Sequence, residues 1–162
     1  MLNHTNIATA CVAFVIASSA AFAQDIYAEV EGWNVRVAEG LKGCAIERTD
    51  ADGFQTQIGI DGNQEMGYVA LFTLADAGID SRDTIITHFD LDGERFVGDS
   101  VRKVDGAYQG GYVYFNNPNF AYDLAKKQTL TITAESGREI AVDLTGTNAA
   151  MEVMRECQMA QQ

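Results

Sequence analysis

The sequence predicts a mainly β domain, an antiparallel β-sandwich or barrel-like fold with a C-terminal α-helix. Three observations predict this class. Short segments rich in β-branched and aromatic residues alternate apolar and polar side chains, which is the period-two pattern of half-buried strands. Turn pairs such as Asp52-Gly53 and Asp92-Gly93, which tolerate the positive φ angles of tight hairpins, separate these segments. Near the C-terminal end, apolar residues recur at helical spacing instead.

The size and charge of the chain limit its class further. Its 162 residues correspond to one domain, and no linker, repeat or low-complexity stretch divides them. The chain has 11 Lys and Arg residues against 23 Asp and Glu residues, a formal net charge of −12. A surface that binds nucleic acid or anionic lipid by charge needs clustered cations. We therefore expect no nucleic-acid partner.

The first 23 residues have the pattern of a cleaved export signal. Residues 7–23 carry no charged side chain and end in Ala21-Phe22-Ala23, the small-x-small pattern that signal peptidase accepts. This apolar stretch is shorter than the ~20 residues that a membrane-spanning helix needs. We expect cleavage of a Sec-type signal after Ala23, a periplasmic or secreted protein, a single β-rich domain over residues 24–162, and no membrane span after cleavage.

The strands are expected in alternating segments along residues 24–162. A helical turn over 120–127 is expected to interrupt them. The expected strands are Trp33–Ala38, Gly43–Thr49, Phe54–Ile60, Gly67–Leu74, Thr84–Phe89, Arg95–Val97, Ser100–Val104, Tyr108–Phe115, Thr129–Thr133 and Glu139–Leu144.

A final helix is predicted after Thr147-Asn148, which would cap it, because Ala150, Met154 and Cys157 then share one face. The predicted exported chain keeps two cysteines, Cys44 and Cys157. An even pair without neighbouring His or Cys residues favours a disulfide in an oxidising compartment. Two unpaired buried thiols are the alternative.

Patterns for catalysis are scarce. His88, Asp90 and Ser100 occur in the order of a chymotrypsin-like triad, but Val101 and Arg102 follow the serine where that family has glycines. A turn with a solvated histidine is the favoured interpretation. We expect no catalytic residue and no cofactor.

A cation site is also disfavoured. The segment 90–94 (DLDGE) spaces its carboxylates like the start of an EF-hand loop. However, Arg95 stands at the sixth position, where the loop needs glycine, and Val101 at the twelfth, where it needs glutamate. An acidic hairpin turn fits better, and we expect no metal site.

The most distinctive segment is the aromatic run over 108–122. In a strand, Tyr112 and Tyr114 share one face while Val113 and Phe115 take the other. Tyrosines beside glycines and amides are typical of peptide- or sugar-binding surfaces, because they offer rigid amphipathic area at low entropic cost. Cross-strand packing explains them without a ligand. We take Tyr112 and Tyr114 as the candidate partner-binding residues.

Several segments suggest a family. The second half contains the run 120–132 (FAYDLAKKQTLTI), then Gly137, Ile140 and the run 143–151 (DLTGTNAAM), and the first half contains Gly32-Trp33, Val35 and Gly43-Cys44. Together they resemble the C-terminal part and the opening Trp strand of the invasion-associated locus B family of bacterial exported proteins. The resemblance implies an exported, mostly β, disulfide-bearing protein linked to the cell envelope, without catalytic residues to carry over.

These observations predict a noncatalytic periplasmic or cell-envelope accessory or binding protein. Its expected partner is an envelope protein or a glycan or peptide ligand. The alternative is a periplasmic hydrolase that acts on glycan or peptide with two carboxylates from separate strands, since such a pair needs only proximity in space. A third hypothesis is a protein inhibitor whose exposed loop blocks an enzyme.

Overall fold

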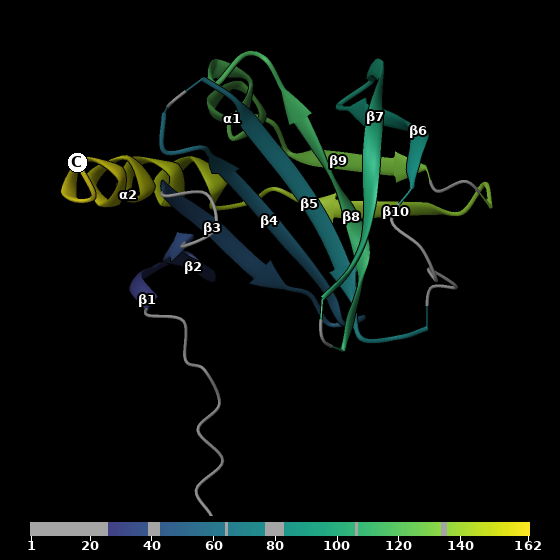
Figure 1. Cartoon of the computed structure of the whole chain (residues 1–162), viewed down its shortest axis with the longest axis horizontal. Coiled ribbons are helices and arrows are strands. Elements are labelled where there is room, and N and C mark those ends of the chain that lie inside the picture. Colours follow the sequence, from purple (N-terminus) through teal and green to yellow (C-terminus); the bar gives the residue numbers. More distant parts are fainter. Residues whose placement is uncertain (1–25, 39–42, 64, 77–82, 106, 134–135) are drawn as a thin grey trace, which may run out of the picture.

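A computed structural model describes residues 26–38, 43–63, 65–76, 83–105, 107–133 and 136–162 (Figure 1). The predicted signal segment, with its cleavage site after Ala23, lies outside these residues.

The described residues form ten strands and two helices. The strands are β1 (Ile26–Val30), β2 (Trp33–Ala38), β3 (Gly43–Thr49), β4 (Phe54–Ile60), β5 (Gly67–Thr73), β6 (Thr84–Leu91), β7 (Glu94–Asp105), β8 (Tyr108–Phe115), β9 (Thr129–Thr133) and β10 (Glu139–Asp143). The helices are α1 (Asn119–Leu124) and α2 (Thr147–Ala160).

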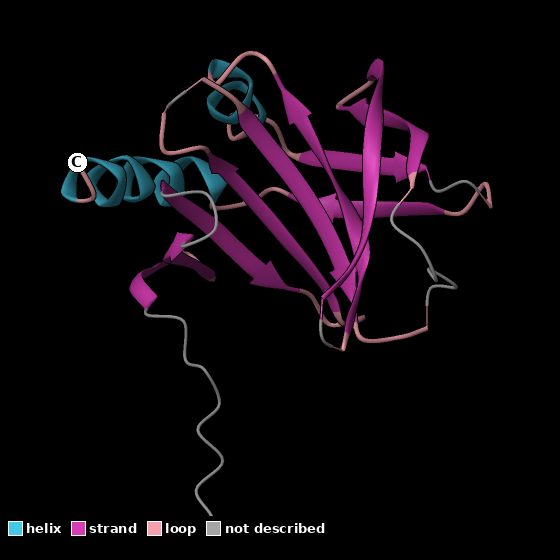
Figure 2. Ribbon diagram, viewed as in Figure 1, coloured by secondary structure: helices cyan, strands magenta, loops and turns pink. Residues whose placement is uncertain are grey.

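All ten strands belong to one antiparallel sheet with the order β1-β2-β3-β4-β5-β8-β7-β6-β9-β10. The sheet curls so that β9 and β10 run at a steep angle to β5 and β8, and α2 packs on β1, β2 and β3 (Figures 1 and 2). Residues from both halves of the curled sheet form one apolar core. The predicted mainly β, sandwich- or barrel-like fold with a C-terminal helix is confirmed.

The sequence interpretation missed one strand and divided another into two. Residues 26–30 form β1, which was not predicted, and the two segments Arg95–Val97 and Ser100–Val104 are parts of the single strand β7. Gly98 lies between the two expected segments, yet it pairs with Thr87 in the ladder. A Cβ atom at Gly98 would lie 3.0 Å from Cγ2 of Val113. Close packing therefore accounts for this glycine.

The cap of α2 also differs from the prediction. The N-cap is Gly146, whose φ of 84° lies in the left-handed region that glycine adopts without steric cost. Thr147, predicted as part of the cap, is buried, and its hydroxyl donates to the carbonyl oxygens of Leu144 (2.6 Å) and Ala125 (3.0 Å). This side chain joins the start of α2 to the end of α1 instead of capping the helix.

The sheet is closed by side chains of β2 and β3 that reach the segment between β10 and α2. The buried Trp33 donates from Nε1 to the carbonyl oxygen of Thr145 at 2.9 Å. Arg48 lies over the Trp33 ring, 4.4 Å from its centroid, and donates from Nη1 to the same carbonyl at 3.1 Å. A second bond of Arg48 reaches the carbonyl of Asp143. These contacts hold the last strand across the first ones.

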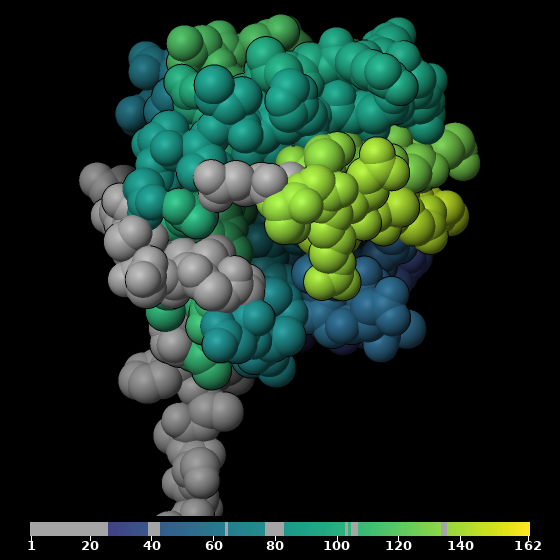
Figure 3. Space-filling view, turned by 90° about the vertical axis from the view of Figure 1, so that its right-hand side faces the viewer, coloured from purple at the N-terminus to yellow at the C-terminus, as the bar shows by residue number. Residues whose placement is uncertain are grey.

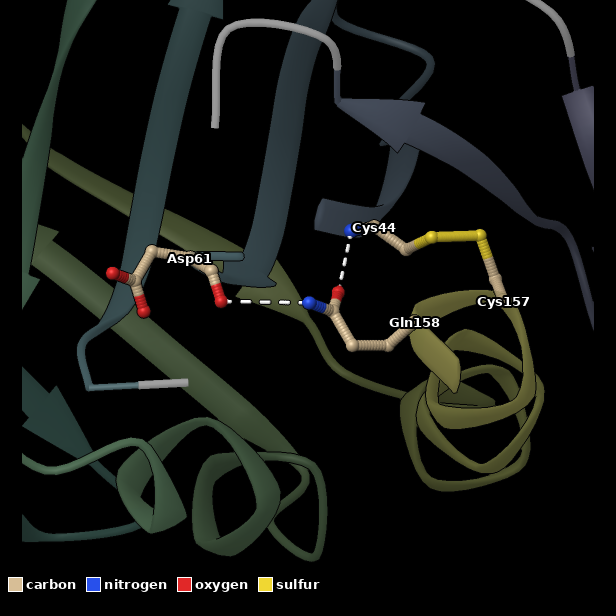
Figure 4. The surroundings of a disulfide bond; sticks show 4 residues. All are labelled: Cys44, Asp61, Cys157 and Gln158. Atoms are coloured by element: carbon tan, nitrogen blue, oxygen red, sulfur yellow. Dashed lines mark hydrogen bonds between the residues drawn. A yellow bond between two sulfur atoms is a disulfide. The ribbon is translucent and has the colours of Figure 1, made fainter. Parts of the chain in front are cut away.

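The predicted disulfide between Cys44 and Cys157 is confirmed, and it joins β3 to α2 with Cα atoms 6.1 Å apart. Gln158 extends this link. Its Oε1 accepts from the Cys44 backbone N–H at 2.7 Å, and its Nε2 donates to the Asp61 carbonyl at 3.5 Å. Figure 4 shows the amide of Gln158 between Cys44 of β3 and Asp61, which follows the last residue of β4. The C-terminal helix is therefore fixed by both a covalent bond and polar contacts.

We predict that the double substitution Cys44→Ala and Cys157→Ala lowers the free energy of unfolding by about 2–5 kcal/mol, because the bond closes a long loop in the unfolded chain. Denaturant unfolding followed by tryptophan fluorescence measures the change. Reduction of the native protein should lower stability by a similar amount, and the double variant should not respond to reductant. Equal stability of the two proteins would contradict a stabilising bridge.

Candidate functional site

The clearest candidate site is an apolar cavity of about 400 Å³ inside the curved sheet. It lies at the end of the sheet away from α1, because its walls include Thr73 and Gln109, whereas α1 packs near Gly67 at the opposite end of β5. Beside the yellow-green β9–β10 hairpin the surface is hollowed (Figure 3). Arg138 of that hairpin lies 5.3 Å from the Phe54 ring and joins the hairpin to β4.

Side-chain size explains why this end of the curved sheet is hollow. Near α1, four phenylalanines pack together in stacked and edge-to-face pairs and fill the space between the strands, namely Phe89, Phe96, Phe115 and Phe120. Farther along the same strands, Gly111 and Ser100 occupy inward positions, and Thr87 lies two residues before Phe89. Small residues leave volume where aromatic residues would close it.

The walls of the cavity are predominantly aliphatic and aromatic. The apolar part comes from inward-facing side chains of β5, β6, β9 and β10, which include Val69, Leu71, Ile85, Phe89, Ile132 and Ile140. Among the described residues, no aspartate or glutamate lines it. Pockets of this size and character are typical of small-molecule sites.

Polar side chains interrupt the apolar wall at Thr73, Thr87, Ser100, Gln109 and Ser136, and two of these residues are buried. Thr87 is 5 % exposed and Ser100 is 8 % exposed, and both line the cavity. Neither hydroxyl has a hydrogen-bond partner among the residues that the structure describes. Buried polar groups are normally hydrogen-bonded, because leaving one unpaired is costly. The two hydroxyls are therefore available to a molecule inside the cavity.

A single cation lines the cavity within the described part of the chain, and an acid compensates it. Arg102 forms an ion pair with Asp83, with Nη2 and Oδ2 2.5 Å apart. The Arg102 backbone N–H also donates to the Asp83 carbonyl at 2.8 Å. The wall thus has little net charge.

Tyr112 and Tyr114 share the face of β8 opposite Val113, and Tyr112 is also among the residues that line the cavity. Their rings are 5.1 Å apart in an edge-to-face arrangement, while Val113 between them is buried in the core. The predicted sharing of faces is confirmed. Tyr114 is 39 % exposed, and Tyr112 packs against a smaller cluster that contains Tyr68 and Phe72. The pair's predicted role in binding a partner stays a prediction.

Tyr68 forms the base of this tyrosine cluster. It is 6 % exposed, and its ring covers Gly59, where a Cβ atom would lie 2.5 Å from Tyr68 Cε1. Burial, helped by the neighbouring Tyr114 and Glu47, raises the pKa of Tyr68 well above its ordinary value. Glu47 itself is buried and pairs with Arg36 at 2.5 Å. Packing and a buried ion pair thus organise the outer face.

The other patterns in the sequence have structural explanations. Ser100 faces the cavity, whereas His88 is exposed on the opposite face of the same strand pair, so these residues do not form a triad. Asp90 accepts from the Gly93 backbone N–H at 2.7 Å. Asp92 accepts from the backbone N–H groups of residues 128 and 129, and these bonds lower its pKa. In the part of the chain described, no three His, Cys, Asp or Glu side chains gather as a metal site would require.

Comparison of the chain with protein-family models, with curated proteins and with solved structures finds no match. No helix among the described residues is long and apolar enough to cross a membrane.

Sequence reasoning did not find the cavity, although one signal was present. In β6 the inward positions read Ile85, Thr87 and Phe89, with a polar residue between two apolar ones. A hydroxyl at an inward position of a strand indicates that a polar group lies opposite it in the core.

We predict that Tyr68→Phe makes the free energy of unfolding less sensitive to alkaline pH. A raised pKa in the folded state favours the protonated phenol, so its contribution is complete below about pH 10 and is lost as the pH rises through the folded-state pKa. Denaturant unfolding between about pH 8 and 11 should show a shallower decline in the variant. Tyr27→Phe, at an exposed tyrosine of β1, should leave the decline unchanged. Equal slopes for the native protein and Tyr68→Phe would contradict this assignment.

Proposed function

We propose that the protein is a noncatalytic, exported binding protein of the periplasm or cell envelope, and that it holds a small apolar molecule in the cavity inside its sheet. The observation that carries the proposal is the aliphatic cavity of about 400 Å³ with two buried hydroxyls. The export pattern that ends at Ala23 and the resemblance to an exported envelope family support the location.

Binding without chemistry fits the composition of this site. Burying apolar surface contributes roughly 25 cal/mol per Å², so a ligand that fills the cavity gains affinity mainly by leaving water. General acid–base catalysis requires a titratable group within hydrogen-bond reach of the substrate. Of the described residues that line the cavity, Arg102 is the one that carries a charge, and it is paired with Asp83. The paired-carboxylate hydrolase hypothesis gains no support from this wall.

We predict that Ile85→Trp abolishes or strongly weakens binding of an apolar fluorescent probe such as naphthalene. Ile85 lines the cavity, and an indole at this position would occupy much of its volume. Ile86→Trp is the matched control, because the neighbouring isoleucine of the same strand is 67 % exposed on the outer face. Fluorescence titration of the full chain measures binding, with at least a tenfold loss expected for Ile85→Trp alone.

The comparison of these two variants decides between cavity and surface binding. An equal loss of probe affinity in both variants would place the probe on the surface. No binding of the probe to the native protein would overturn the proposed function. Circular dichroism and denaturant unfolding of both variants show whether the larger side chain is accommodated.

The outer tyrosine pair is a separate part of the proposal, as the contact surface for an envelope protein, glycan or peptide. We predict that Tyr112→Ala with Tyr114→Ala weakens crosslinked capture of partners from envelope extract severalfold, read by mass spectrometry. Tyr27→Ala, an exposed tyrosine on β1, is the control. Because Tyr112 packs on the Tyr68 cluster, the unfolding transition of the double variant is measured alongside. Unchanged capture removes both residues from the contact surface.

A further inference from the structure

We infer that the molecule held in the cavity is neutral, contains about a dozen non-hydrogen atoms, and carries one hydroxyl or carbonyl oxygen that hydrogen-bonds to Ser100 and Thr87. This inference rests on the proposed function and defines its ligand class.

The size follows from the volume of the cavity. A water-sized group occupies about 30 Å³ in a condensed phase, so about 400 Å³ accommodates about 13 such groups. The cavity therefore suits a compact ring system or a medium-length chain.

The single polar atom of the ligand is inferred from the hydroxyls of Ser100 and Thr87. Ser100 pairs with Ile85 in the ladder between β6 and β7, and Thr87 is two residues along β6 on the same inward face. The two hydroxyls are thus diagonal neighbours on one wall, roughly 7 Å apart at their backbone positions. Each can donate or accept. Together they offer a polar spot on the buried part of the wall that an alcohol or a carbonyl oxygen satisfies.

The neutral character of the ligand follows from the charges that line the cavity. A carboxylate would enter a site whose lining cation, within the described residues, is already paired with Asp83 at 2.5 Å. Such a ligand would lose its hydration without gaining an unpaired positive charge, which is unfavourable. An amine would likewise meet no aspartate or glutamate in the described wall.

Three fluorescent compounds that share one ring system test this assignment, namely naphthalene, 2-naphthol and 2-naphthoate. Near pH 7 the full, disulfide-bonded chain should bind 2-naphthol about threefold to tenfold more tightly than naphthalene, the range expected for a neutral hydrogen bond. It should bind 2-naphthoate at least tenfold more weakly than 2-naphthol. Fluorescence titration gives the three dissociation constants.

Two variants test the role of the hydroxyls. Ser100→Ala and Thr87→Val should each remove most of the preference for 2-naphthol and leave naphthalene affinity within about twofold. Thr84→Val is the matched control, because this threonine is exposed on the other face of β6. It should change neither affinity.

The outcomes separate the ligand class from the proposed function. If naphthalene binds as tightly as 2-naphthol, or if the preference survives in both hydroxyl variants, the ligand class is overturned while cavity binding stands. Tightest binding of 2-naphthoate would overturn the neutral character. If none of the three compounds binds, both the proposed function and its ligand class fail.

Discussion

The closure of the curved sheet at the Thr145 carbonyl is the constraint on which the other features depend. An antiparallel sheet of ten strands has two edges, and here β1 and β10 lie at opposite ends of the strand order. The curl is fixed by side chains instead of a continuous ladder, because Trp33 and Arg48 both donate to this one oxygen. The indole is fully buried, so losing its partner would leave a polar N–H unpaired in the core.

The same curl creates both the core and the cavity. Inward side chains of distant strands meet across the curved sheet, and the result depends on their size. Where phenylalanines meet, as at Phe96 and Phe120, the space is filled. Where the small residues Gly111 and Ser100 are the ladder neighbours of Leu71 and Ile85, the space stays open. A protein without a role for the opening would gain stability from larger residues there, since each buried methylene contributes about 0.8 kcal/mol. Larger side chains at these positions would therefore gain stability at the expense of the open volume.

Local properties could be predicted from the sequence, whereas long-range geometry could not. Alternation placed most strands, and the even cysteine pair predicted the bridge between Cys44 and Cys157. The strand that contains Gly98 was expected as two segments, because a glycine that allows close packing and one that ends a strand look the same in sequence. The cavity was missed because its walls come from strands spread from β4 to β10. Only their register and the curl of the sheet bring Ile85, Ser100 and Leu71 to one space.

The position of the disulfide also determines how the chain transmits mechanical force. Its two cysteines are 113 positions apart and enclose β4 to β10 and most of α2 in one covalent loop. Tension applied at the two ends passes through the sulfur bridge, so pulling extends the residues before Cys44 and the few after Cys157. The strands that line the cavity stay outside the path of the force. Tension on the residues before Cys44 also pulls β2 and Trp33 away from the Thr145 carbonyl, so force would loosen the closure of the sheet while the bridge holds the later strands in one covalent loop.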